Sequence, residues 1–586
     1  MEPVDYFENL ENVNKKRYDA MRSFFVDKLP AEKVARCYGY SMSSFYSLTR
    51  DFRQFIRKNP DPDEDFFFKS TVKGRKTKQL QDVDQMIIGL RKQNFSSEEI
   101  VCIMNSKDHD LSYGYVYKLL NNEGFARLPR RGKDEKQKLT LPKIEAPVSS
   151  ALEFSNEKFQ SNSTGIFAFL PYIRKFGIDK AISSSDYPET KIINRLSSIL
   201  SFLALKLSSV KRYSNDDMWC MDRGLGMFAG LNVLPKSAWL SSYSSRVTKD
   251  MNLNFLKSLH KIWCQCGLLS DTSNLDFTTI PYWGDDKHLE NNWSGKRNKA
   301  LSSMLSVLAQ DPDSGIIDYG DTDVMHNKEP NVVLEYLDFY KKNTEGQQNL
   351  KYLIFDSKFT NYENLSKLDE QNIKFITIRR RGKNIVEQIN KNNSFKTIRV
   401  ETGGLKKRTL KIRDELITLR GYYNFKTKEL KQIRQIIITG HGKTKPALII
   451  TNDLDLTSEK IVRKYCRRWI VEKSISEQIE FFHLNRISSS MVIKVDFDLT
   501  MTILAHNIYR LFARDLERYS NFSDERIYRK FIANNGIVQA KNRTINIELK
   551  KKRDLPQIIQ MMKNFNSLKY PWINNSELNF IPSSTS

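Results

Sequence analysis

Residues 352–356 read Tyr-Leu-Ile-Phe-Asp, a short apolar run that ends in a carboxylate. Such a run predicts a buried strand, with Asp356 at its end. A second carboxylate, Asp276, lies within Asn274–Tyr282, a run of apolar residues and threonines in which aspartate is otherwise disfavoured. Two acids on two predicted strands are therefore the starting point for both the fold and the chemistry.

Strand and helix patterns alternate on both sides of these acids. We predict an antiparallel meander of three strands, with turn residues at 311–315, over Asn274–Tyr282, Leu301–Ala309 and Ile316–Tyr319. Helices are predicted over Glu329–Lys342 and Asn361–Gln371, and a further strand over Phe375–Ile378. A later segment, Thr457–His483, predicts one long helix that contains a third acid, Glu472.

The sequence around the three acids resembles that of DDE transposases of the insertion-sequence type, whose RNase H-like core carries a β-rich insertion. The stretches that carry the resemblance are Leu275–Thr278, Leu353–Ser357 and Tyr465–Glu472. The last resembles the family signature Tyr-x2-Arg-x3-Glu-x6-Lys, with Tyr465, Arg468 and Glu472 in register. Ile479 takes the place of the lysine, so another side chain has to supply the DNA contact of that lysine. The resemblance covers residues 165–520.

The resemblance implies a metal-dependent site. The first and fourth strands of an RNase H-like sheet are neighbours, so Asp276 and Asp356 would lie side by side, and a helix packed on the sheet would add Glu472. Three carboxylates at one place repel one another, and hard divalent cations, two Mg²⁺ or Mn²⁺ ions, relieve that repulsion. We therefore expect these three acids to be catalytic residues and metal ligands, with Arg468 and Tyr465 contacting the DNA backbone.

Ordinary structural roles compete with this reading. Asp276 could be a strand-end carboxylate and Asp356 could cap the loop that follows it. Glu477 and Glu480 are alternatives to Glu472, although the Tyr-Arg-Glu register favours Glu472. Arg468 is one helical turn before Glu472 and could simply form an ion pair with it.

The net charge indicates a polyanionic partner, with nucleic acid first and an acidic membrane surface second. The 586 residues carry a formal charge of +25. Residues 374–445 hold 20 Lys and Arg against 5 Asp and Glu, a surplus of 15. Their predicted strands are Lys396–Val400, Thr409–Arg413, Leu416–Phe425 and Ile433–Gly440. We interpret this segment as a basic β-rich insertion beside bound DNA, although a charged stretch is more often only a solvated face.

Members of the resembled family hold transposon-end DNA with such insertions and in some cases stack a flipped base on a tryptophan. This insertion contains no tryptophan, so Tyr422, Tyr423 or Phe425 would have to stack instead. The candidate DNA contacts at the start of the insertion are Arg379, Arg380 and Arg381.

The first 125 residues predict two helical modules of the helix-turn-helix type. In Leu29–Ile56 a turn at Tyr38–Tyr40 precedes a second helix that carries Arg50, and Asp84–Glu123 repeats this plan with Lys118 on its last helix. A helix with outward basic and tyrosine side chains fits the major groove of DNA. A plain helical bundle is the alternative. The basic linker that follows adds Arg130 and Arg131 as phosphate contacts.

Two further observations bear on the cell compartment. No apolar stretch reaches the roughly 20 residues of a membrane span, and the N-terminus lacks a signal-peptide pattern. Six scattered cysteines predict reduced thiols rather than disulfides or a zinc site. We expect a cytoplasmic protein that associates with the nucleoid of a prokaryote, without a membrane partner.

The expected fold is a multidomain α+β chain. Its predicted segments are helix-turn-helix modules at 1–125, a basic linker at 126–164, a helical intermediate domain at 165–269, an RNase H-like α/β core of mixed sheet at 270–380 and 451–524, the β-rich insertion at 381–450, and a mainly helical C-terminal extension at 525–586.

The expected function is cut-and-paste transposition of DNA. A metal-activated water would cleave double-stranded DNA at inverted repeats, and the freed 3′-hydroxyl would attack target DNA, with a homodimer holding both ends in a synaptic complex. The alternatives are an RNase H-like DNA nuclease without strand transfer and a domesticated sequence-specific DNA-binding regulator.

Overall fold

The structure is a computed structural model in which residues 13–58, 66–67, 78–92, 95–105, 109, 111–123, 125, 156–211, 219–281, 290–294, 299–322, 324–343, 350–382, 385–387, 389, 394–402, 406–442, 445–484 and 492–583 are described. The chain divides into two compact units, residues 1–127 and residues 128–586. Within the described residues, no helix combines the length and the apolar character that crossing a bilayer requires.

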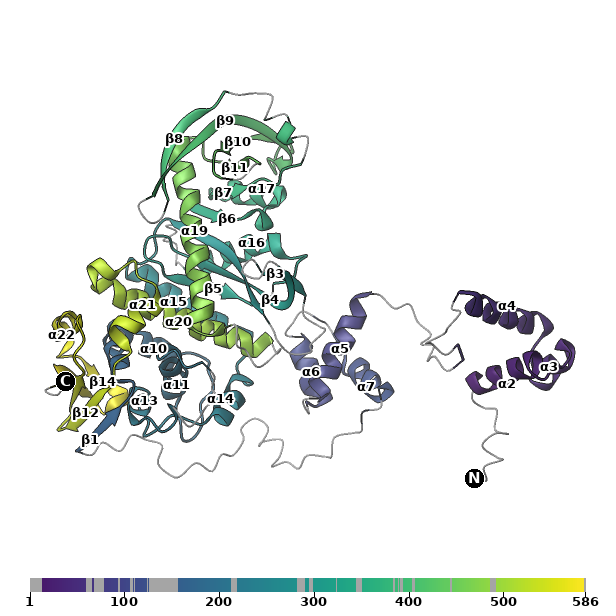
Figure 1. The fold of residues 1–586 in the computed structure, drawn as a ribbon, viewed down its shortest axis with the longest axis horizontal. Coiled ribbons are helices and arrows are strands. Elements are labelled where there is room, and N and C mark those ends of the chain that lie inside the picture. Colours follow the sequence, from purple (N-terminus) through teal and green to yellow (C-terminus); the bar gives the residue numbers. More distant parts are fainter. Residues whose placement is uncertain are drawn as a thin grey trace. The chain divides into compact units, whose positions relative to one another are not determined.

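The first unit consists of short helices (Figure 1), and its elements are α2 (Val13–Phe25), α3 (Ala31–Cys37), α4 (Met42–Lys58), α5 (Lys78–Lys92), α6 (Ser97–Asn105) and α7 (Tyr113–Asn122). Gly39 ends the turn between α3 and α4 at a φ of +68°, a left-handed conformation that glycine adopts without strain. A capping box starts α6, since Ser96 Oγ accepts from the Glu99 amide and Glu99 Oε2 accepts from the Ser96 amide.

The second unit begins with helices that bury most of their surface. They are α9 (Leu170–Lys175), α10 (Ile178–Ser183), α11 (Arg195–Leu207), α13 (Arg223–Phe228), α14 (Ser237–Ser244) and α15 (Lys249–Gln265). The side chains of α11 are buried from Ser197 to Leu207, because this helix is apolar on all sides and packs within the main core. The helical character predicted for residues 165–269 is confirmed.

A ten-stranded mixed sheet forms the centre of this unit (Figure 1). The strands before the insertion are β2 (Thr272–Pro281), β3 (Asn291–Ser294), β4 (Lys299–Gln310), β5 (Ile317–Asp321), β6 (Tyr352–Phe355) and β7 (Lys374–Ile378), with α16 (Val332–Asn343) and α17 (Tyr362–Glu370) between them. The predicted antiparallel meander is confirmed, because β4 pairs antiparallel with both β2 and β5. Strand β6 then lies parallel to β2, and β7 lies parallel to β6.

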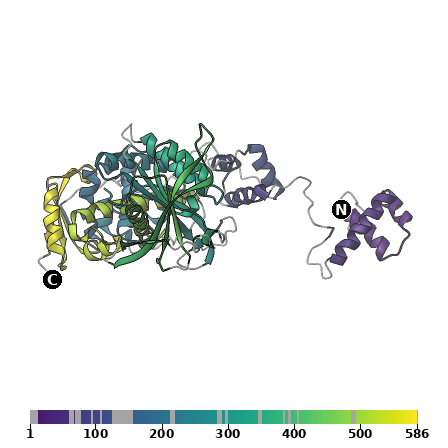
Figure 2. The same cartoon turned by 90° about the horizontal axis from the view of Figure 1, so that it is seen from above.

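The basic insertion extends this same sheet. Its strands are β8 (Lys396–Thr402), β9 (Lys406–Tyr423), β10 (Leu430–Thr439) and β11 (Ala447–Thr451), and the sheet order continues from β7 through β11, β10 and β9 to β8. Figure 2 shows the strands of the sheet fanning out as the sheet twists. The two strands predicted over Thr409–Arg413 and Leu416–Phe425 are one continuous strand, because Asp414 and Glu415 pair with β10 instead of forming a turn.

Two long helices follow the insertion, α19 (Ser458–Phe481) and α20 (Val492–Asp515). Helix α19 packs on β2, β6, β7 and β8, so it crosses the sheet from the insertion to the strands that carry the predicted acids (Figure 1). Helix α20 packs against α11, α15 and β5. The short helix α21 (Asp524–Ile527) contacts both α19 and α20.

The expectation of a mainly helical C-terminal extension is wrong. Residues 525–586 contain α22 (Leu555–Met562) and the strands β12 (Gly536–Lys541), β13 (Thr544–Leu549), β14 (Lys569–Tyr570) and β15 (Ser576–Pro582). In β13 the apolar side chains alternate with polar ones and are buried, which is the two-residue period of a strand.

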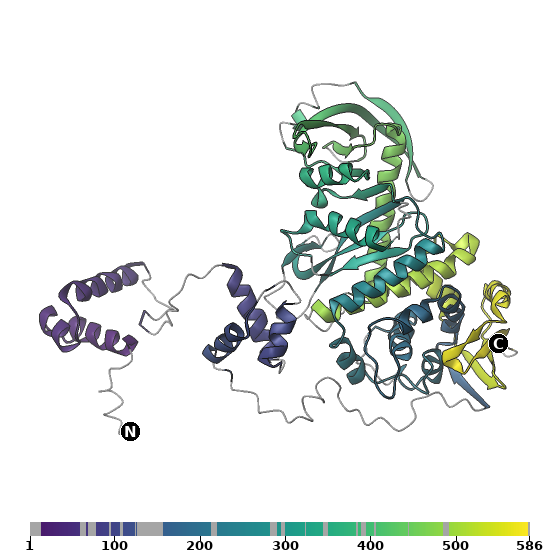
Figure 3. The same cartoon turned by 180° about the vertical axis from the view of Figure 1, so that it is seen from behind.

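These C-terminal strands form a five-stranded sheet with β1 (Glu157–Ser161) at its edge (Figure 3). Strand β1 pairs antiparallel with β12, with Phe159 opposite Val538. The expectation of a linker over residues 126–164 is therefore wrong at its end, since residues 157–161 belong to this sheet.

Candidate active site

Asp276 and Asp356 lie on neighbouring parallel strands. Leu275 of β2 pairs with Phe355 of β6. Asp276 directly follows Leu275, and Asp356 directly follows Phe355. Neighbouring strands are about 4.8 Å apart, so the two carboxylates start from adjacent backbone positions. Asp276 is buried and Asp356 is half-buried. The adjacency expected from the sequence is thus present in the sheet.

Each aspartate also has local hydrogen-bond donors. Asp276 Oδ1 accepts from the backbone amide of Phe277 at 2.9 Å, and Asp356 Oδ1 accepts from the amide of Ser357 at 2.6 Å. Asp356 thereby caps the short 3-10 helix Ser357–Phe359. Capping and metal binding are compatible here, because a carboxylate has further lone pairs on both of its oxygens.

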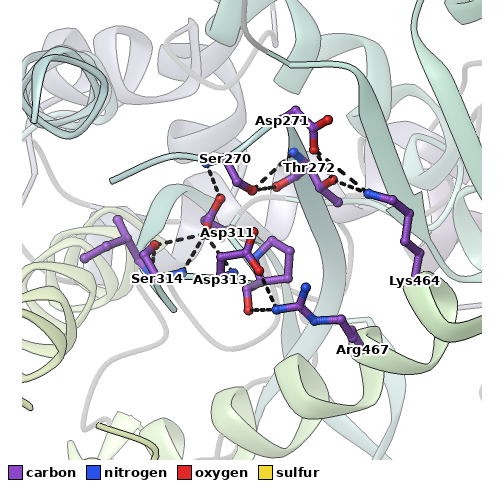
Figure 4. Close-up of polar contacts among 10 residues, drawn as sticks. Ser270, Asp271, Thr272, Asp311, Asp313, Ser314, Lys464 and Arg467 are labelled. Atoms are coloured by element: carbon purple, nitrogen blue, oxygen red, sulfur yellow. Dashed lines mark hydrogen bonds and ion pairs between the residues drawn. The ribbon is translucent and has the colours of Figure 1, made fainter. Parts of the chain in front are cut away.

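Helix α19 brings basic side chains to β2 at a regular spacing. Lys464 Nζ donates to Thr272 Oγ1 at 2.9 Å (Figure 4). One turn later, Arg468 Nη1 donates to Asp276 Oδ2 at 3.1 Å. The helix and the strand therefore run in the same direction. Burial lowers the pKa of Lys464 below its usual value. The signal that could have identified Lys464 is its position four residues before Arg468, on the same helix face.

Arg468 is almost completely enclosed. Its side chain is 4% exposed and that of Asp276 is 8% exposed. The guanidinium also lies 5.6 Å from the ring centroid of Tyr465, which is itself buried. In this arrangement Arg468 contacts a predicted catalytic carboxylate, and Tyr465 supports the arginine from the side of the apolar core.

Glu472 is part of α19, one turn beyond Arg468. Four residues of α-helix advance the backbone by about 6 Å and rotate it by about 40° past a full turn, so the Glu472 backbone position follows Arg468 on nearly the same face. The side chains of residues 469–479, which include Glu472, Glu477 and Ile479, lie outside the described part of the structure. Glu480 is exposed.

The carboxylates fit a hard divalent cation by their chemistry, because Mg²⁺ prefers carboxylate oxygens and few protein ligands. Asp276 and Asp356 supply two such groups from adjacent strands. Among the described side chains, no cluster of three or more His, Cys, Asp or Glu is close enough to hold a metal ion. The side chain of Glu472, the third predicted ligand, lies outside that set.

An aromatic pair borders the two aspartates. The rings of Phe277 and Phe359 stack with centroids 3.9 Å apart and planes 3° apart, and Lys358 Nζ lies 5.8 Å from the Phe277 ring. Lys358 was not among the residues predicted from the sequence. Its position two residues after Asp356 is the only sequence signal for it.

The arginines at the start of the insertion differ in their surroundings. Arg379 Nη1 donates to Gln435 Oε1 at 2.8 Å, and Arg381 Nη1 donates to the Pro446 carbonyl at 2.6 Å, while Arg380 is exposed. All three lie immediately beyond β7. Arg380 and Arg381 are both exposed, whereas Arg379 is half-buried.

The aromatic residues proposed to stack on a base are not equivalent. Tyr422 is 1% exposed, packs edge-on against Phe375, and burial together with Asp369 raises its pKa well above the usual value. A side chain so enclosed cannot stack on a base, so Tyr422 is removed from that set. Tyr423 and Phe425 are half-buried, and their ring centroids are 4.7 Å apart.

The remaining predicted DNA contacts lie far from these acids in sequence. In the first unit, Arg50 is exposed and pairs with Asp51 at 3.4 Å, and Lys118 is exposed on α7. Arg130 and Arg131 lie outside the described residues.

Comparison with known families is decisive for the central segment. Residues 271–508 match the family model described as the transposase DDE domain. Residues 271–508 carry a transposase DDE domain. The DDE domain begins one residue before β2 and ends within α20, so it contains Asp276, Asp356 and Glu472 together with the whole insertion.

Among solved structures, the cryo-EM structure of the piggyBac transposase synaptic complex with hairpin DNA is similar to this chain at 10% identity and a TM-score of 0.34. The alignment covers 64% of this chain and 82% of that chain. The sequence matches no curated protein.

Proposed function

We propose that the chain is a DNA transposase that cleaves DNA at transposon ends and transfers the freed 3′-hydroxyl to target DNA. The observation that carries the proposal is the adjacency of Asp276 and Asp356 on β2 and β6 within the DDE domain. The strand order β5-β4-β2-β6-β7, in which β4 alone runs opposite to the other four strands, supports an RNase H-like core.

In this proposal Asp276, Asp356 and Glu472 hold a pair of Mg²⁺ ions, for which Mn²⁺ can substitute. Two ions about 3.5–4 Å apart would activate the attacking oxygen and stabilise the leaving oxygen of a phosphodiester. The protein contributes positioning. The backbone amides of Phe277 and Ser357 orient one oxygen of each aspartate, which leaves the other lone pairs available.

Arg468 is a positioning residue in this scheme. Its hydrogen bond to Asp276 Oδ2 fixes the rotamer of that carboxylate, and its positive charge offsets the repulsion between neighbouring acids. A guanidinium also matches the geometry of a phosphodiester, so Arg468 could share its donors with bound DNA. Lys358 and Lys464 add positive charge on the two sides of the site.

The N-terminal unit would recognise the inverted repeats. Helix α4 follows the turn at Gly39 and presents Tyr46, which is 55% exposed, together with Arg50. This arrangement supports the helix-turn-helix hypothesis, in which α4 is the recognition helix. The basic insertion would hold DNA beside the site, and a homodimer would hold two DNA ends.

The test is cleavage of a duplex that carries the element's own ends, in the presence of Mg²⁺. The variant Asp356→Asn should lose cleavage by at least about 100-fold, since a metal ligand is removed, while its affinity for the duplex changes less than about threefold. The matched control is Asp338→Asn, a 71% exposed carboxylate of α16, which should cleave as the unchanged protein does.

Two outcomes would contradict the proposal. Cleavage that survives in Asp356→Asn would show that the site is elsewhere. Cleavage without joining of the 3′-end to a target duplex would favour a nuclease, and binding without any cleavage in Mg²⁺ or Mn²⁺ would favour a regulator.

A further inference from the structure

A cavity of about 610 Å³ opens beside α19 within the second unit. Its walls are residues 267–270 before β2, the β4–β5 turn at 310–315, Arg467 of α19, the end of α20 and residues 520–526. Arg467 is the residue before Arg468, so it projects about 100° around the helix from the predicted active site. The volume lies in the range of ordinary ligand pockets.

The two aspartates of the β4–β5 turn already have donors within the protein. Asp311 accepts from the amides of Ser270 at 2.6 Å and Ser314 at 2.7 Å, and Asp313 pairs with Arg467 at 2.6 Å (Figure 4). These contacts hold the β4–β5 turn against the start of β2. The charge of Asp313 is offset by Arg467, and Asp311 points its oxygens at backbone amides.

The third aspartate, Asp524, is buried and equally well paired. It accepts from Arg510 at 2.6 Å and lies 2.6 Å from His506 Nδ1. Burial alone would raise the pKa of Asp524, but the charges of His506 and Arg510 hold it below the usual value. Arg510 also donates to the carbonyls of Ser520 and Phe522, so this cluster fixes the cavity wall.

Two further arginines on the wall have no such carboxylate partner. Arg514 and Arg526 are both exposed, and no acid in the described part of the chain forms an ion pair with either. The guanidinium of Arg526 lies 4.6 Å from the ring centroid of Phe522, which holds it at the cavity wall. The cavity therefore has four arginines against three paired aspartates, and its free donors are guanidinium groups.

Guanidinium groups with free donors are the protein groups best suited to phosphate, which they bind through two parallel hydrogen bonds. The cavity also lies close to the predicted active site. Thr272, next to the cavity wall, is four residues before Asp276 on β2, a span of about 13 Å.

We propose that this cavity binds a phosphodiester of the DNA backbone, held by Arg514 and Arg526, on the DNA that enters the predicted active site. The proposal rests on the proposed function, which makes DNA the ligand. It assigns the C-terminal end of α20 and residues 520–526 to the DNA-binding surface, in addition to the basic insertion.

The test uses the full chain with the double variant Arg514→Ala/Arg526→Ala and a labelled duplex that carries the element ends. Binding is measured by fluorescence anisotropy at several NaCl concentrations. Each lost phosphate contact lowers the slope of log K against log salt by about 0.9. The two arginines hold one phosphodiester, so the slope should fall by about 0.9. The matched control is Arg518→Ala/Arg529→Ala, which removes the same charge from exposed arginines outside the cavity and should leave the slope within about 0.5.

A second variant guards against a folding defect. Arg514→Lys/Arg526→Lys keeps both charges and should keep the slope of the unchanged protein, while its affinity falls because lysine lacks the two-pronged donor. A slope in the alanine variant equal to that of the control overturns the proposal. Stabilisation of the unchanged protein by millimolar inorganic phosphate, lost in the alanine variant without any change in the DNA slope, also overturns it in favour of a free-phosphate site.

The two proposals fail separately. If Asp356→Asn still cleaves DNA but the slope of log K against log salt falls in the alanine variant, the predicted active site is wrong and the cavity remains a DNA-binding site. If Asp356→Asn loses cleavage and the slope is unchanged, only the cavity proposal is wrong.

Discussion

Replacing Arg468 with methionine should destabilise the second unit strongly. The Arg468 and Asp276 side chains are 4% and 8% exposed and are joined at 3.1 Å. Methionine fills much of the arginine's volume but leaves the buried carboxylate without its cation, a loss that costs about 3–5 kcal/mol. We expect the free energy of unfolding to fall by that amount in guanidinium titrations at pH 7 in the presence of a chelator.

The double variant Arg468→Met/Asp276→Asn isolates the interaction. Asparagine leaves a neutral group beside methionine. The loss of unfolding free energy in the double variant should therefore be smaller than the sum of the two single-variant losses by about 1.5–3 kcal/mol. The control is Arg463→Met, which breaks an exposed i,i+4 pair with Glu459 and should cost less than about 0.5 kcal/mol. Strictly additive losses, or an Arg468→Met variant as stable as the control, would refute the reasoning.

Three further predictions concern the fold. Burial alone would lower the pKa of His260, but its hydrogen bond to Asp318 and its contact with a neighbouring thiol raise the pKa to about 9 from 6.5. The protonated imidazole then stabilises the fold by about 3 kcal/mol below pH 6.5, and this contribution is lost as the pH rises through 9. His260→Gln should flatten that part of the plot of unfolding free energy against pH. Burial, aided by a nearby carboxylate, raises the pKa of Asp496 to about 7 from 3.8. The buried charge therefore costs more stability as the pH rises, and the free energy of unfolding of Asp496→Asn, relative to that of the unchanged protein, should increase by about 2–3 kcal/mol between pH 5 and pH 8. A difference in denaturant titrations that stays the same at both pH values would contradict this. A Cβ on Gly165 would lie 1.9 Å from the Ile532 carbonyl oxygen, so Gly165→Ala should lower the melting temperature by several degrees through a loss of about 3 kcal/mol, and a variant that melts with the unchanged protein would refute the close approach.

The two aspartates could be predicted from the sequence because each interrupts a local pattern. Asp356 ends an apolar run and Asp276 is an acid within a strand, and both signals survive in the structure as adjacent strand positions. The order of the strands could not be derived from periodicity, since pairing between residues 80 positions apart depends on the whole sheet. It was reached through the resemblance.

Other features escaped prediction for identifiable reasons. The strand β1 pairs with β12 across nearly 380 residues of sequence, and nothing within residues 157–161 indicates a distant partner. Strand β13 lies in the segment for which a mainly helical extension was expected, although the alternation of its apolar and polar residues is that of a strand. Burial of Tyr422 depends on α17 and β7 and could not be seen from its own neighbours.

The points where the insertion leaves and rejoins the DDE domain are direct neighbours. The Arg379 amide donates to the Leu448 carbonyl, and Arg381 reaches the Pro446 carbonyl, so the chain departs from β7 and returns to β11 across a single antiparallel pair. Residues 382–445 could therefore be exchanged for a two-residue reverse turn without rerouting the backbone on either side. Strand β11 now pairs with β10 and would become an exposed edge strand. An exposed edge strand can pair with other chains and promotes aggregation. A shortened version of this protein would therefore need a charged residue or a proline in β11 to avoid aggregation.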